Sequence, residues 1–162
     1  MAQFDPLGAL RVLLDHRVRF IVIGGVAGAA HGSPLITQDL DICYERNPDN
    51  LKRLAAALQE LHAKLRGVDD DVPFILDAKT LKAGDHFTFV TDAGDLDVMG
   101  TPAGSAGYED LAAEAMETEL DGLRVLVASL DDLMAMKRAA RRPKDLAALE
   151  ILGALRDEIS GT

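Results

Sequence analysis

Two glycines and two aspartates have the types and spacing that phosphate and metal chemistry requires. Gly24 and Gly25 follow the apolar run FIVI, and Asp39 and Asp41 lie in the later run DLDICY. A glycine corner lets a phosphate approach the backbone closely, and the free amides of a helix that starts there favour an anion. Carboxylates at i and i+2 on a strand share a face, where Mg²⁺ or Mn²⁺ would offset their repulsion. The pair of motifs predicts a nucleoside triphosphate and metal site.

A third carboxylate is expected from the segment HFTFVTDAGDLDVMG. Residues 86–91 and 95–99 read as a β-hairpin around an Asp-Ala-Gly turn. Asp97 lies between Leu96 and Val98 and therefore points away from the core. Asp95 shares that face but sits beside the turn, so Asp97 is the favoured ligand and Asp95 the weaker one.

A basic cluster follows near the end of the chain, within a protein that has 17 Lys and Arg against 27 Asp and Glu. Lys137, Arg138, Arg141 and Arg142 fall within six residues, at the predicted end of a helix that Ser129 caps. Such cations can simply complement the helix dipole. Their concentration in an acidic chain favours instead one defined anionic ligand.

These motifs together resemble the nucleotidyltransferase superfold of the DNA polymerase β type, and more narrowly the minimal bacterial AbiEii-type nucleotidyltransferase toxins. The resemblance extends over nearly the whole chain, from the Gly-Gly corner and D-x-D pair through GDLDVMG to VASLDDLMAMKRAARRPKDLAALEIL. It implies catalytic and metal-binding roles for Asp39, Asp41 and Asp97. It implies nucleotide-binding roles for the following residues: Gly24, Gly25, Thr37, Lys137, Arg142 and Asp145. For Asp145, in the first turn of the last helix, we expect support of the Lys and Arg rather than metal ligation.

The resemblance also implies an activity. The expected reaction is Mg²⁺- or Mn²⁺-dependent transfer of a nucleoside monophosphate from a nucleoside triphosphate to a hydroxyl of tRNA or protein. The setting it implies is a toxin–antitoxin or phage-defence system, with a cognate antitoxin or toxin as a further partner. The alternative is a non-catalytic interaction module that keeps the fold, although such a module would be expected to lose carboxylates that are costly to bury without metal.

Two polar residues near the motifs have open roles. His31 follows the small-residue helix and either satisfies that helix end or contacts substrate. Thr37 either reaches a phosphate or metal-bound water, or is an ordinary β-branched residue entering a strand.

Length, charge and cysteine content restrict the class of protein. The 162 residues suit a single nucleotidyltransferase-like domain, 1–162, in which C-terminal helices over 129–160 complete the site. One Cys excludes an internal disulfide framework and fits a reducing cytoplasm. No leader or apolar run of about 20 residues appears, so neither secretion nor membrane insertion is expected. A net charge of −10 argues against broad nonspecific nucleic-acid binding, although not against one tRNA end.

The remaining pattern predicts an α/β (α+β) fold, a mixed sheet with flanking helices. Helices are expected at 6–15, 26–31, 49–66 and 108–116, and strands at 19–23, 86–91, 95–99 and 123–127, besides the D-x-D strand. The 49–66 helix rests on leucines repeating at three and four, ending at Leu65.

Overall fold

A seven-stranded mixed sheet with helices around it forms the protein in the computed structural model, which describes residues 3–160. The elements in chain order are α1 (Pro6–Asp15), β1 (Phe20–Ile23), α2 (Gly24–Ala30), β2 (Asp39–Tyr44), α3 (Pro48–Glu60), β3 (Lys64–Leu65), α4 (Ala78–Ala83), β4 (His86–Thr91), β5 (Gly94–Met99), α5 (Tyr108–Glu114), β6 (Met116–Leu120), β7 (Leu123–Val127), α6 (Leu130–Ala140) and α7 (Pro143–Ile159). The expected fold class is confirmed. Within residues 3–160, no helix combines the length and apolarity needed to cross a membrane.

The sheet has the strand order β3-β4-β5-β2-β1-β7-β6. β2 lies at its centre, antiparallel to β1 and parallel to β5. The register of β2 and β5 places Asp39 opposite Asp95 and Asp41 opposite Asp97. Since opposite residues of paired strands share a face, all four carboxylates lie on one side of the sheet.

The other side of β2 and β5 is the core. Leu40, Ile42, Leu96 and Val98 are each at most 1% exposed. The alternation of buried aliphatic and partly exposed acidic residues along both strands is what fixes their register, because a shift by one residue would bury the carboxylates.

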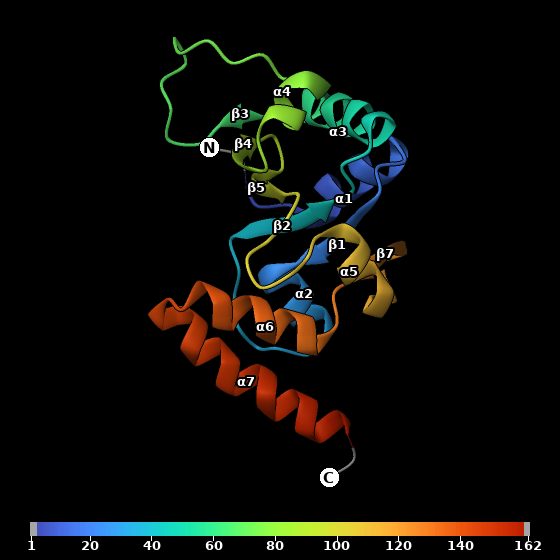
Figure 1. Ribbon diagram of the computed structural model, residues 1–162, viewed down its shortest axis with the longest axis vertical. Coiled ribbons are helices and arrows are strands. Elements are labelled where there is room, and N and C mark those ends of the chain that lie inside the picture. The colour runs from blue at the N-terminus through green and yellow to red at the C-terminus, as the bar shows by residue number, and fades with distance from the viewer. Residues whose placement is uncertain (1–2, 161–162) are drawn as a thin grey trace.

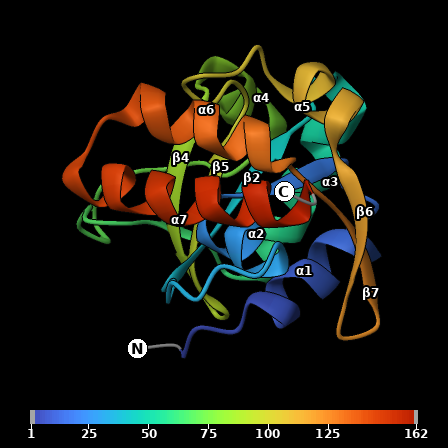
Figure 2. The ribbon, with the colours of Figure 1, turned by 90° about the horizontal axis from the view of Figure 1, so that it is seen from below.

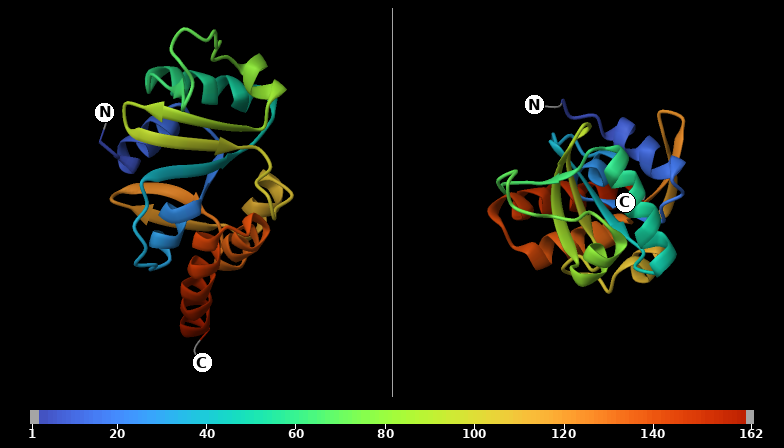
Figure 3. Two further views of the ribbon diagram at one scale, coloured as in Figure 1. Left: turned by 90° about the vertical axis from the view of Figure 1, so that its left-hand side faces the viewer. Right: turned by 90° about the horizontal axis from the view of Figure 1, so that it is seen from above.

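Two groups of helices lie at opposite ends of the molecule (Figure 1). α3 and α4 lie at the top of that view and α2, α6 and α7 at the bottom, with the sheet between them. Seen from below, α6 and α7 run side by side (Figure 2), and α7 is the outermost element (Figure 3, left). The C-terminal pair therefore packs beside α2, which follows the glycine corner.

A tight reversal joins the last two helices. Ser129 caps α6 by accepting a hydrogen bond from the Asp132 amide at 3.1 Å. Arg141, in the left-handed region at φ 55°, ends α6, and Pro143 begins α7. The reversal returns α7 along α6, so that Asp145 comes to lie beside Lys137.

Two predicted helices are too long. The helix expected over 49–66 ends at Glu60, because His62 takes a left-handed conformation with φ 52°, and Leu65 lies on the edge strand β3. The helix expected over 108–116 ends at Glu114, and Met116 starts β6, a strand that the sequence pattern did not predict. In both places local helical spacing continued past the residue where strand pairing begins.

Candidate nucleotide and metal site

Three aspartates from two parallel strands converge on one point. Asp39 and Asp41 of β2 and Asp97 of β5 each offer a carboxylate oxygen, and these oxygens lie within 4.8 Å of one another. All three residues are partly buried. Hard oxygen donors at this spacing fit Mg²⁺ or Mn²⁺, which bind through a few carboxylates together with substrate phosphates.

The concentration of charge shows in the titration of Asp41. Burial, with the neighbouring charges of Asp39 and Asp97, raises the pKa of Asp41 from 3.8 to about 7, although Lys137 acts in the opposite direction. A raised pKa of this origin means that the neighbouring groups do not compensate the charge of the ionised carboxylate. A divalent cation would supply that compensation.

The glycine corner is shaped by close contacts with the acidic strand. Gly24 has φ +69°, and a Cβ atom there would lie 2.1 Å from Oδ2 of Asp41. A Cβ atom on Gly25 would lie 2.6 Å from Cβ of Thr37. Both glycines are thus needed to let α2 begin directly against β2, whether or not a phosphate also approaches the corner.

His31 and Thr37, the two residues whose roles the sequence left undecided, have different contacts in the structure. The Thr37 hydroxyl lies 3.0 Å from the Asp39 carbonyl oxygen and 3.2 Å from Oδ1 of Asp39, so it is positioned to orient that carboxylate. The His31 Nε2 lies 2.8 Å from the carbonyl oxygen of Ala128. His31 therefore connects the end of α2 to the segment before α6. This contact agrees with the first of the two roles considered for His31, that of satisfying the helix end.

Asp145 joins the two cations expected to contact the triphosphate. It is fully buried, with Lys137 Nζ 3.2 Å from Oδ1 and Arg142 Nε 2.7 Å from Oδ2. Its Oδ2 also accepts a hydrogen bond from the Arg142 amide at 3.0 Å. Burial alone would raise the pKa of Asp145, but the hydrogen bonds from Arg142 and Lys137 outweigh it and lower the pKa to about 2. Asp145 is thus an anion that positions both cations.

A cavity of about 300 Å³ connects the acidic and basic groups. Gly24, Asp41, Lys137, Arg142 and Asp145 line its polar part. Its other walls are largely apolar and include Met99, Pro102, Leu133 and Met136. The combination of carboxylate, cations and apolar walls suits a ligand that has both an anionic part and a flat, weakly polar part.

Arg66 is the site residue that sequence analysis missed. Its Nη2 lies 2.7 Å from Oδ1 of Asp97, and its Nε lies 3.5 Å from Oδ2 of Asp95. Asp95, the weaker candidate, is more exposed than Asp97 (42% against 15%) and is outside the group of three carboxylates. No spacing signal in the sequence connects Arg66 with this site, because it follows the two-residue strand β3.

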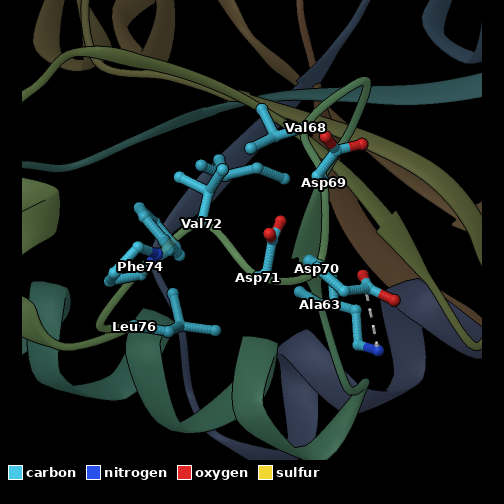
Figure 4. Close-up of a pocket in the computed structure, with 11 residues that line it drawn as sticks. Ala63, Val68, Asp69, Asp70, Asp71, Val72, Phe74 and Leu76 are labelled. Carbon is cyan, nitrogen blue, oxygen red and sulfur yellow. Dashed lines mark ion pairs between the residues drawn. The ribbon is translucent and has the colours of Figure 1, made fainter.

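A separate cavity of about 330 Å³ lies beneath the segment between β3 and α4 (Figure 4). Val72, Phe74 and Leu76 line one side, and Asp69 and Asp70 the other. The carboxylates here are exposed and do not converge on a common point with the three site aspartates. The cavity that includes Asp41 is therefore the better candidate site.

Comparison with solved structures shows the same architecture. One similar structure is a Thermotoga maritima protein described as a candidate nucleotidyltransferase. The match includes 99% of this chain and 98% of the Thermotoga chain, at 18% identity and a TM-score of 0.52. The lincosamide antibiotic adenylyltransferase LnuA matches 92% of this chain with 94% of its own, at 12% identity and a TM-score of 0.63. The chain has the nucleotidyltransferase fold.

A third structure with this nucleotidyltransferase fold is ANT(2'')-Ia in complex with adenylyl-2''-tobramycin. It covers 96% of this chain over 95% of its own, at 15% identity and a TM-score of 0.58. The sequence matches no protein-family model and no curated protein. The comparisons therefore bear on architecture, and the chemistry of this chain has to be argued from its own residues.

Proposed function

We propose that the protein is a metal-dependent nucleotidyltransferase that moves a nucleoside monophosphate from a nucleoside triphosphate to a hydroxyl group. The observation that carries the proposal is the convergence of Asp39, Asp41 and Asp97 within 4.8 Å. One of them, Asp41, lines a cavity that Lys137 and Arg142 also line. The similarity of fold to antibiotic adenylyltransferases supports it.

The three carboxylates would hold one or two Mg²⁺ or Mn²⁺ ions. When bound, the metal would supply positive charge to the triphosphate and lower the barrier to attack at the α-phosphorus. Asp97, on the β4 side of the group, would orient the acceptor hydroxyl and receive its proton. The acceptor oxygen forms a bond to the α-phosphorus while the bond to the bridging oxygen breaks, and pyrophosphate leaves.

The basic residues would neutralise that leaving group. Lys137 and Arg142 are held by buried Asp145 at the rim of the cavity, so their orientation is fixed before the nucleotide arrives. Gly24 and Gly25 would bring the first amides of α2 close to the phosphates, and Thr37 would hold Asp39 in place. The apolar walls formed by Met99, Pro102 and Met136 would receive the base.

The C-terminal helices belong to the same functional unit in this proposal. Lys137 lies on α6 and Asp145 on α7, and both line the cavity that includes Asp41 of β2. A single domain, 1–162, completed by helices over 129–160, accounts for that arrangement. A cytoplasmic location is proposed because the single cysteine, Cys43, is a free, buried thiol, and a chain without disulfides fits a reducing compartment.

For the acceptor, we propose tRNA or a protein, as the resemblance to AbiEii-type enzymes implies, in a toxin–antitoxin or phage-defence setting with a cognate partner. A small-molecule hydroxyl is the second candidate. It is favoured by two neighbours in fold that were solved with lincomycin and adenylyl-2''-tobramycin, and by the net charge of −10, which disfavours long polyanions.

The test is a transfer assay with α-phosphate-labelled ATP, CTP, GTP and UTP. Each would be incubated with Mg²⁺ and, in separate reactions, with total tRNA, a protein extract, lincomycin or tobramycin. Label entering one acceptor class in the wild type but not in the Asp41→Asn variant supports transfer and names the acceptor. A folded protein that binds nucleotide but labels nothing, alone or with a co-purifying partner, supports the non-catalytic module.

A further inference from the structure

Arg66 forms an ion pair with Asp97, one of the three carboxylates proposed to hold the metal. Its Nη2 contacts Oδ1 of Asp97 at 2.7 Å and also donates to the Phe89 carbonyl oxygen at 2.9 Å. The Arg66 amide donates to the Thr88 carbonyl oxygen at 2.9 Å, which anchors the residue to β4. A guanidinium on a carboxylate forms one of the stronger hydrogen bonds in proteins. A cation bound by Asp97 must therefore share Oδ1, bind Oδ2 close to the positive guanidinium, or displace Arg66, and each of these weakens its binding.

Asp97 is already engaged by neighbouring groups, which limits its capacity to bind a metal ion together with Arg66. One of its oxygens contacts Arg66, and Asp97 also interacts with the neighbouring Asp41 carboxyl group. With its side chain only 15% exposed, Asp97 has limited access to solvent that could otherwise satisfy it. Arg66 thus supplies part of the positive charge that a metal at Asp97 would bring.

A second carboxylate is within reach of Arg66. Its Nε is buried and has no hydrogen-bond partner among residues 3–160, although Oδ2 of Asp95 is only 3.5 Å away. A buried donor without a partner costs free energy, so a small shift of the guanidinium toward Asp95 would be favourable once Asp97 is engaged elsewhere. The two carboxylates lie on the same face of β5, two residues apart.

We propose that Arg66 is a positioning residue that lies between the two carboxylates of β5: it competes with a metal for Asp97, and its guanidinium shifts further toward Asp95 when metal binds. This inference rests on the proposed function, since it assigns the metal to Asp97. It gives Asp95 a role that does not require metal ligation. It also makes a prediction opposite in sign to that for a merely structural arginine, whose removal would weaken or leave unchanged the binding of metal.

The test is Mn²⁺ binding without nucleotide, measured by titration calorimetry on the wild type, Arg66→Gln and Arg66→Lys, with thermal unfolding to verify folding. Loss of the competing guanidinium is expected to tighten Mn²⁺ binding about tenfold in Arg66→Gln. A smaller gain is expected in Arg66→Lys, because an ammonium group lacks the second donor of the fork. Arg46→Gln is the matched control: it removes an arginine paired with Asp85 at 3.2 Å and is expected to leave Mn²⁺ binding unchanged.

A double-mutant cycle with Asp95→Asn tests the role of Asp95 as the alternative partner of Arg66. In the wild-type background, loss of Asp95 should weaken Mn²⁺ binding severalfold, and in the Arg66→Gln background it should have a clearly smaller effect. Weaker or unchanged binding in both Arg66 variants, or an equal effect of Asp95→Asn in both backgrounds, would overturn the inference. If the wild type bound no Mn²⁺, or bound it equally after Asp41→Asn, the proposed function itself would fail, which is a distinct result.

Discussion

Replacing Asp41 with Asn should remove activity and yet stabilise the metal-free protein. Burial and the charges of Asp39 and Asp97 raise the pKa of Asp41 from 3.8 to about 7. The folded protein therefore binds a proton that the unfolded chain has already lost, and this contribution to stability is complete below about pH 4 and is lost as the pH rises through about 7. Three pKa units correspond to about 4 kcal/mol, an upper limit for the gain in free energy of unfolding above pH 7.

Thermal unfolding in the presence of EDTA would measure the effect. For a chain of this length, each kcal/mol shifts the melting temperature by about 2–4 °C, so Asp41→Asn should melt up to roughly 8–16 °C higher than wild type at pH 8 and equally at pH 4. Added Mg²⁺ or Mn²⁺ should stabilise the wild type more than the variant and narrow the gap. A variant that melts at or below the wild-type temperature at pH 8, or a difference that does not change with pH, would show that the pKa of Asp41 is not raised.

Three further changes have defined outcomes. Gly24→Ala places a Cβ atom 2.1 Å from Oδ2 of Asp41 at φ +69° and should weaken Mn²⁺ binding about 10–100-fold, whereas Gly153→Ala, with its nearest contact at 3.7 Å, should leave calorimetric binding unchanged. Asp145→Ala should cost about 3 kcal/mol in chemical denaturation at pH 7, because its pKa of about 2 reflects a buried, paired anion; the loss should shrink as the pH falls from 4 toward 2. Lys137→Gln should raise the nucleotide dissociation constant about tenfold with Mn²⁺ binding retained; unaltered nucleotide binding would remove Lys137 from the triphosphate site.

The acidic half of the site was predictable because strand alternation decides it. Leu40 and Ile42 have to be buried, and so Asp39 and Asp41 share the opposite face; the same logic applies to Asp97. The sequence also indicated Asp145, because a carboxylate in the first turn of a helix that follows a basic cluster can cap amides or pair with a cation. In the structure it accepts from the Arg142 amide and pairs with both Lys137 and Arg142.

The positions of Arg66 and Gly25 in the site depend on tertiary contacts that the sequence pattern did not indicate. Arg66 lies in a stretch whose leucine spacing reads as helix, and only the left-handed turn at His62 and the pairing of β3 with β4 bring it to Asp97. Gly25 was expected to let a phosphate approach the backbone. The structure shows that a side chain at this position would also collide with Thr37. Neither relation has a local sequence signal, because each joins segments that meet only in the folded sheet.

Metal-dependent nucleotide binding at Asp39 and Asp41 can be measured by titration calorimetry of each nucleoside triphosphate, with and without Mg²⁺, into the wild type and an Asp39→Ala, Asp41→Ala double variant. We expect at least one nucleotide to bind in a Mg²⁺-dependent manner, and this binding to disappear in the folded double variant. Binding that is unaffected by Mg²⁺ or by loss of both carboxylates, or no binding of any of the four by the folded wild type, would contradict it.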